Sequence, residues 1–173
     1  ERMPYAMNTN LPDDIAVTLC EEAGEVFNAR YDAKSKIYVY RIHNSNVRDP
    51  FEKDRAWHYP IPLKLENMQR AAEYLVGTHD FTAFMAAGGQ QKQMEKEMYE
   101  VSVSQQDKLF EIKVHANSYL YNMVRIITGT LVYAGNGKLQ PEDMKDILLS
   151  KDRKRAGMTA PPQGLYLHKV FYE

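Results

Sequence analysis

Residues 99–115 read YEVSVSQQDKLFEIKVH, two alternating runs on either side of the polar segment Gln106-Asp107-Lys108. The apolar members of the two runs are Tyr99, Val101 and Val103, then Phe110, Ile112 and Val114. Successive side chains of a strand point to opposite faces, so each run has one apolar and one polar face. The stretch predicts an antiparallel β-hairpin with one face in the core and the other in water.

Further strands and helices are predicted on both sides of this hairpin. Alternating runs predict strands over residues 15–20, 36–43 and 165–172. Apolar residues at helical spacing predict a helix over 65–75 with Gly77 as its left-handed cap, one over 119–133 capped by Asn117 or Ser118, and one after Pro141. The aperiodic segments 44–62 and 85–97 are predicted to be long loops.

The predicted elements fix the fold class. Strands outnumber helices, neighbouring strands can pair as hairpins, and there is neither an internal repeat nor a regular alternation of strand and helix, which predicts an α+β fold with an antiparallel sheet. The length of 173 residues suits one domain, and 44% hydrophobic with 26% charged residues is ordinary for a soluble protein. The longest run without Asp, Glu, Lys or Arg is the 13 residues 156–168, whereas a membrane span needs about 20 apolar residues. No membrane partner is therefore expected.

The sequence offers little for metal or thiol chemistry. The single cysteine, Cys20, lies in an apolar run and is predicted to be buried and structural, which suits a reducing cytoplasm. The five histidines lie far apart, without His-Glu-x-x-His or paired-cysteine spacing, so no metal ligand is predicted. No phosphate-binding loop motif is present, and the net charge of -1 neither suggests nor excludes a nucleic-acid partner.

Two features could carry chemistry. Arg125 is the only charge in the apolar helix predicted over 119–133, so it is expected to be buried and to need an anionic partner. It either forms a structural ion pair, reaches the surface along its stem, or holds a catalytic carboxylate or a phosphate. Tyr38 and Tyr40 share one face of the strand over 36–43. They either pack as ordinary strand aromatics or form a stacking platform like those of RNA-binding sheets.

Six ordered segments resemble the bacterial tRNA pseudouridine synthase A family. They are Asn8-Thr9-Asn10-Leu11-Pro12-Asp13-Asp14-Ile15, Phe27-Asn28-Ala29-Arg30, Lys36-Ile37-Tyr38-Val39-Tyr40, His79-Asp80-Phe81-Thr82-Ala83-Phe84, Met123-Val124-Arg125 with Gly129, and Ala156-Gly157-Met158-Thr159-Ala160-Pro161-Pro162 followed by Gly164-Leu165-Tyr166-Leu167. The family's Gly-Arg-Thr-Asp-x-Gly-Val-His segment, which carries the nucleophilic aspartate, is absent. The chain, which begins Glu1-Arg2-Met3, therefore resembles the C-terminal two-thirds of a member.

The resemblance implies a pseudouridine synthase fold, with helices on one face of the sheet, over residues 1–173. It implies a cytoplasmic, homodimeric enzyme without a cofactor that converts uridine to pseudouridine at positions 38 to 40 of the tRNA anticodon stem-loop. Tyr38 is then expected to stack on the flipped uracil, Arg125 to pair with the missing aspartate, and Leu165 to line the pocket. The resemblance assigns no catalytic residue within this chain, which alone is expected to be inactive. The alternative is a non-catalytic RNA-binding module that uses the same sheet face.

Overall fold

The computed structural model describes residues 2–90 and 93–173. The chain forms two compact units, one ending at Asp32 and the other spanning Ala33–Glu173. The first unit contains one short helix, α1 (Met3–Asn8), and a long irregular segment. The side chain of Asn8 holds part of that segment, because its amide group both donates to and accepts from the backbone of Val17, at 2.9 and 2.7 Å.

The strand predicted over residues 15–20 is wrong. The segment is irregular, and none of the strand pairings among the described residues includes it. Ile15 and Leu19 are 54% and 67% exposed, and Cys20, predicted to be buried, is exposed as well. Alternation supplies an apolar face but not the neighbouring strand whose backbone groups complete a ladder, and this segment has no such neighbour in its unit.

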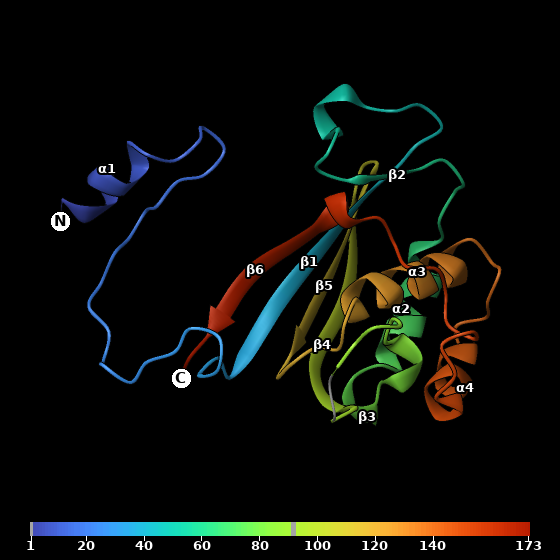
Figure 1. Ribbon diagram of the computed structural model, residues 1–173. Coiled ribbons are helices and arrows are strands. Elements are labelled where there is room, and N and C mark those ends of the chain that lie inside the picture. Colours follow the sequence, from blue (N-terminus) through green and yellow to red (C-terminus); the bar gives the residue numbers. More distant parts are fainter. Residues whose placement is uncertain (1, 91–92) are drawn as a thin grey trace. The chain divides into compact units, whose positions relative to one another are not determined.

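The second unit is built on a six-stranded sheet (Figure 1). Its path is β2-β1-β5-β4-β3, and β6 pairs with β1 beside β2. The strands are β1 (Ser35–Asn44), β2 (Trp57–Tyr59), β3 (Gly77–Asp80), β4 (Glu95–Gln106), β5 (Leu109–Ala116) and β6 (Leu165–Phe171). Every pairing is antiparallel except that of β1 with β2. The α+β class and the strands predicted over 36–43 and 165–172 are confirmed.

The predicted hairpin is β4 and β5. Val101 lies opposite Val114 and Val103 lies opposite Ile112, and all four side chains are buried. Asp107 makes the turn with a positive φ of 52°, a conformation that aspartate tolerates better than most residues. The alternation therefore predicted both the pairing of this hairpin and the face that enters the core, except at Tyr99, which is 44% exposed at the register shift between Met98 and Glu100.

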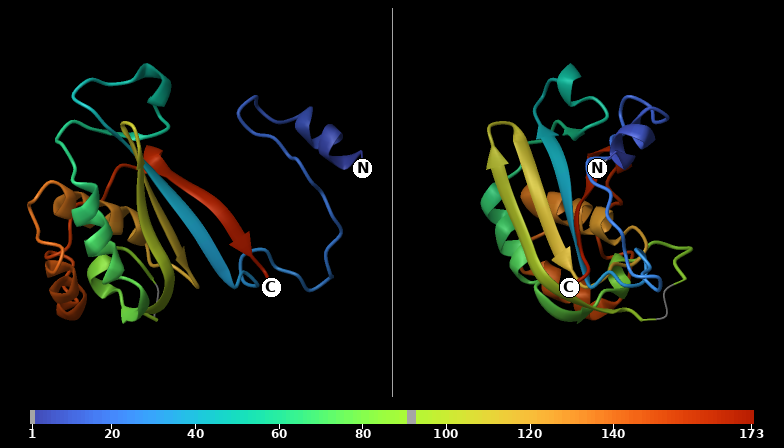
Figure 2. Two further views of the ribbon diagram at one scale, coloured as in Figure 1. Left: turned by 180° about the vertical axis from the view of Figure 1, so that it is seen from behind. Right: turned by 90° about the vertical axis from the view of Figure 1, so that its left-hand side faces the viewer.

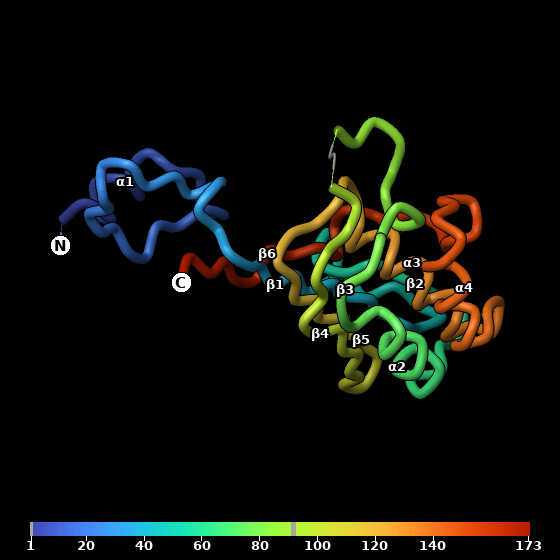
Figure 3. Tube along the Cα trace, turned by 90° about the horizontal axis from the view of Figure 1, so that it is seen from below, coloured from blue at the N-terminus to red at the C-terminus, as the bar shows by residue number. Residues whose placement is uncertain are grey.

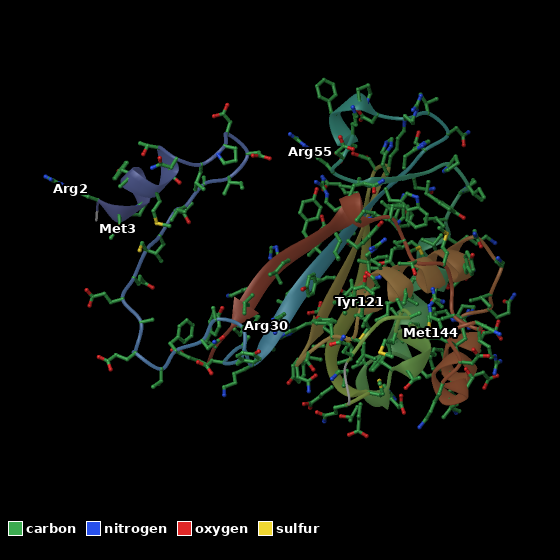
Figure 4. The ribbon with its side chains drawn as sticks, in the orientation of Figure 1. Arg2, Met3, Arg30, Arg55, Tyr121 and Met144 are labelled. Atoms are coloured by element: carbon green, nitrogen blue, oxygen red, sulfur yellow. The ribbon has the colours of Figure 1, made fainter. Side chains whose placement is uncertain are left out.

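Three helices cover one face of the sheet, as the resemblance implied (Figure 2). They are α2 (Leu65–Glu73), α3 (Met123–Gly135) and α4 (Asp143–Ser150). Nearly every residue of α3 is buried, and α2 packs against both α3 and β4. Met144 of α4, labelled in Figure 4, is 2% exposed within this helical layer. A helix apolar around most of its circumference needs such cover on several sides.

The boundaries of two predicted elements need correction. Helix α3 begins at Met123, four residues after its predicted start, because Asn122 has left-handed backbone angles (φ 58°, ψ 14°) that no α-helix accommodates. Gly77 does have a positive φ of 109°, but it begins β3, whereas the C-cap of α2 is Tyr74. Strand β3 was not predicted, since four residues provide too short a pattern.

The two predicted loops are shorter than expected. Segment 44–62 contains the 3-10 turn Pro50–Glu52 and the edge strand β2. The predicted loop over 85–97 ends where β4 begins at Glu95, and its residues 91 and 92 lie outside the described residues. Residues 85–90 extend away from the sheet (Figure 3). Within the described ranges no helix is long and apolar enough to cross a membrane.

Candidate active site

Tyr38, Arg125 and Leu165 line one small pocket of about 120 Å³. They are separated by up to 127 residues in the sequence, and they come from β1, α3 and the first position of β6. The pairing of β6 with β1 sets Leu165 opposite Tyr40, two positions from Tyr38. The remaining lining residues are Tyr119, Leu120, Asn122, Met123 and Val124. The fold thus brings together all three residues that the resemblance singled out.

Tyr38 is held by a second aromatic ring. Tyr119 meets it edge to face, with ring centroids 5.0 Å apart and planes at 86°, and the Tyr119 hydroxyl donates to the backbone carbonyls of Lys36 and Val114. Burial raises the pKa of both phenols, so both are neutral near pH 7. Tyr38 is only partly buried, and a neutral ring fixed at a pocket wall can stack on a planar group.

Tyr40 does not belong to an exposed platform. It is 0% exposed in the core, where its hydroxyl donates to the Pro161 carbonyl at 2.6 Å. Burial raises its pKa, and the positive charge of Arg125 partly opposes that shift. Of the two alternatives for Tyr38 and Tyr40, ordinary strand packing therefore holds for Tyr40, and a platform formed by both rings is excluded because Tyr40 lies in the core.

Arg125, expected to be buried, is half-buried at the first turn of α3. Its Nε donates to the Ala160 carbonyl at 2.6 Å, and its Nη1 donates to Asn122 Oδ1 at 3.1 Å. The structural ion pair, one of the alternatives for Arg125, is not found, because no carboxylate of the described residues lies within 4.0 Å of this guanidinium. A cation therefore faces a pocket whose lining residues carry no acid.

Two residues of this site were missed in the sequence. Tyr119 and Asn122 fall inside the predicted helix, where neither appeared to have a separate role. The left-handed turn at Asn122 ends the irregular approach to α3 and places its side chain against Arg125. The available signal was the spacing of Asn122 and Arg125 by three residues, together with the tolerance of asparagine for left-handed angles. Tyr121 beside them is 50% exposed (Figure 4).

A larger hollow of about 530 Å³ lies beside the loop after β1 and contains none of the predicted residues. Its cations Arg48 and Lys53 are nearly balanced by the carboxylates of Asp49, Glu52 and Asp54. Its lining therefore favours no particular ligand charge. Among the residues described, no cluster of three or more His, Cys, Asp or Glu side chains could hold a metal ion.

Comparisons with known proteins show the family of the chain that carries the smaller pocket. The family model described as tRNA pseudouridine synthase matches residues 71–173, more than half of the chain. The chain belongs to this family. Its relatives include the tRNA pseudouridine synthase A of Thermoanaerobacter pseudethanolicus, which is 47% identical over 172 residues, 99% of this chain and 70% of that protein. The synthase of Bacillus subtilis is 43% identical over 173 residues, 100% of this chain and 70% of that protein.

These alignments cover practically the whole chain, including the residues before 71. Tyr38 and the first unit therefore lie within the similarity to the synthases, and so do Arg125 and Leu165. The resemblance drawn from six short segments is confirmed at the level of the family. The roles that the resemblance implies for Tyr38, Arg125 and Leu165 are proposals.

Proposed function

We propose that this chain is the C-terminal part of a tRNA pseudouridine synthase that isomerises uridine at positions 38 to 40 of the anticodon stem-loop. The observation that carries the proposal is the convergence of Tyr38, Arg125 and Leu165 on one pocket in a chain that is 43 to 47% identical to proteins named tRNA pseudouridine synthase A. The pocket is smaller than the roughly 300 to 1,000 Å³ typical of drug-sized ligands. Its size suits one flipped base rather than a whole oligonucleotide.

In this proposal Tyr38 holds the base. A uracil that leaves the RNA stack loses its neighbours, and a fixed aromatic face returns part of that stacking energy. The ring must also stay in place after its bond to the ribose breaks, so that C5 can rejoin the sugar. Tyr119 prevents Tyr38 from turning away, and Leu165 closes the apolar side of the pocket. Water is thereby kept from the reacting atoms.

Arg125 receives the nucleophilic aspartate, which in this proposal comes from residues outside the present chain. A guanidinium has five N–H donors, and the contacts to Ala160 and Asn122 use two of them, leaving three. These suffice for a bidentate pair with a carboxylate, which holds the acid ionised and aimed. Because the pocket lining has no acid of its own, the arriving aspartate meets no competitor there.

The assembled enzyme follows from the same proposal. Strand β6 lies at an edge of the sheet, because β1 is its only pairing partner among the described strands. Its residues 166–169 are exposed. We propose that the remaining part of the enzyme pairs there, and that the enzyme is a cytoplasmic homodimer without a cofactor. A non-catalytic RNA-binding module is less well supported, because the sheet face that it needed is buried by helices.

Release of tritium from tRNA labelled at C5 of uridine tests the proposal. The chain alone should release no more than a blank without enzyme, whereas the complete enzyme should release tritium from tRNAs with uridine at positions 38 to 40. Replacing those uridines by cytidine should abolish the release. Turnover by the 173-residue chain alone would refute the assignment of the nucleophile to missing residues. An inactive complete enzyme would refute the proposed function.

A further inference from the structure

The segment containing Ala160 helps to fix the direction in which Arg125 points, together with the bond from Arg125 Nη1 to Asn122. Besides the bond from Arg125 Nε to the Ala160 carbonyl, the Ala160 N–H donates back to the Arg125 carbonyl at 3.0 Å. The two residues thus exchange hydrogen bonds, one through a side chain and one through the backbone. Any displacement of Ala160 moves the Nε acceptor and turns the guanidinium fork.

The segment over residues 156–161 has no regular secondary structure that could hold Ala160 by itself. It packs directly on α3, since a Cβ on Gly157 would lie 2.6 Å from backbone atoms of Gly129 and Thr130. The Gly157 N–H donates to Thr130 Oγ1 at 2.9 Å. The Met158 backbone also packs closely on Gly129, and the Tyr40 hydroxyl donates to the Pro161 carbonyl. These contacts hold the segment on the side of the sheet and of α3, and its other side needs a separate support.

Arg153 supplies that support. Its Nη1 donates to the carbonyls of Gly157 at 2.8 Å and Ala156 at 3.4 Å, and its Nη2 donates to Thr159 Oγ1 at 3.1 Å. One planar group therefore spans residues 156 to 159, immediately before Ala160. A lysine could not do so, because an ammonium is a single point donor on a flexible stem.

Withdrawing the charge of Arg153 from water at this position costs free energy. The side chain is half-buried, all three of its acceptors are neutral, and burial lowers its pKa. A cation withdrawn from water without an anionic partner destabilises a protein unless its hydrogen bonds compensate. Its neighbour Arg155, two residues further along, is exposed, so the basic run does not require this burial.

We infer that Arg153 is a positioning residue for the pseudouridine synthase site, acting on Arg125 through residues 156–160. It touches neither the pocket nor the expected aspartate, and its effect is to hold the Ala160 carbonyl where Arg125 Nε meets it. The inference rests on the function proposed above for its catalytic consequence. Its structural content, the dependence of Arg125 orientation on Arg153, can be tested in the present chain without any activity.

The first experiment measures hydrogen exchange of the arginine Nε–H groups by NMR in the 173-residue chain. Arg153→Lys should speed exchange at Arg125 roughly tenfold or more, because the Nε–H bond to Ala160 loosens. Arg155→Lys is the matched control and should leave it unchanged. Thr159→Val, which removes one acceptor and keeps Arg153, should give a smaller increase. Unchanged Arg125 exchange in a folded Arg153→Lys chain overturns the inference.

The second experiment separates positioning from general stability in the complete enzyme. Arg153→Lys should lower kcat roughly 10- to 100-fold, the range expected for a misplaced catalytic partner, with the KM for tRNA unchanged. The same substitution in an Arg125→Lys background should have no further effect on kcat, because Arg153 acts only through the orientation of the Arg125 guanidinium. If the effects of the two substitutions on kcat multiply in the double variant, the inference is wrong. An inactive unsubstituted enzyme would instead refute the proposed function, while the exchange experiment would still decide the role of Arg153.

Discussion

Replacing Tyr40 by phenylalanine tests whether the buried hydroxyl anchors the segment before β6. The side chain is 0% exposed, and its hydroxyl donates to the Pro161 carbonyl at 2.6 Å. Phenylalanine keeps the ring, which packs perpendicular to that of Trp57 at a centroid distance of 6.4 Å. The substitution therefore removes one hydrogen bond and leaves a carbonyl that water reaches poorly.

The magnitude follows from that geometry. A hydrogen bond between neutral groups contributes about 0.5 to 1.5 kcal/mol, and a buried acceptor left unpaired costs about 1 to 3 kcal/mol. We expect Tyr40→Phe to lower the free energy of unfolding by about 1 to 2 kcal/mol, toward the lower ends of these ranges because Pro161 is only partly buried. In a chain of this size the loss corresponds to a decrease in Tm of roughly 2 to 8 °C.

Tyr166 provides a matched control. Its hydroxyl also donates to a backbone carbonyl, that of Arg55, and also at 2.6 Å, but the residue is 37% exposed. Because water can replace that bond, Tyr166→Phe should change the free energy of unfolding by no more than about 0.5 kcal/mol. Urea unfolding followed by circular dichroism measures both variants. Equal losses, or no loss for Tyr40→Phe, would refute the argument that burial sets the strength of this bond.

The remaining predictions concern the pocket and its support. In the complete enzyme, Tyr38→Phe should lose activity. Tyr38→Leu should in addition bind tRNA more weakly by about 1 to 3 kcal/mol, because it also loses the stacking ring. Equal tRNA affinities for the two variants would show that Tyr38 does not stack on the base. Arg125→Lys should lower tritium release roughly 100-fold, since an ammonium cannot replace the planar fork, and a fully active lysine variant would contradict this. Burial raises the folded-state pKa of Tyr40 above the ordinary value of 10.0, so its stabilising effect is complete below pH 10 and is lost as the pH rises further. Above pH 10 the free energy of unfolding should therefore fall less steeply with pH in Tyr40→Phe than in the unsubstituted chain, and the two slopes should differ by up to about 1.4 kcal/mol per pH unit. Equal slopes for the two proteins would contradict this prediction. Gly157→Ala should destabilise the chain by about 1 to 3 kcal/mol, because the added Cβ meets backbone atoms at 2.6 Å. The control Gly24→Ala should not destabilise it, because a Cβ added there meets nothing within 4 Å. Equal Tm values for the two variants would refute the packing argument.

The α+β class, the β4 and β5 hairpin and three helices with apolar faces could be predicted from local pattern. Each depends on side-chain periodicity over eight or more residues, and periodicity is a property of the chain alone. The same reasoning failed for residues 15–20, where alternation was present but none of the described strands pairs with the segment. It also failed at Asn122, where a single left-handed residue, invisible to periodicity, sets the start of α3.

The sequence by itself also pointed to Arg125, Tyr38 and Leu165, the first through its isolation in an apolar helix and the others through resemblance to a family. Only the tertiary structure decided that the three share one pocket, that Arg125 meets a carbonyl and an amide rather than an acid, and that Tyr40 is core. Those facts depend on pairing β6 with β1 and on packing α3 against residues 156–160. Such contacts join residues more than 25 positions apart, and their geometry is set by the packing of the whole domain, which no local pattern encodes.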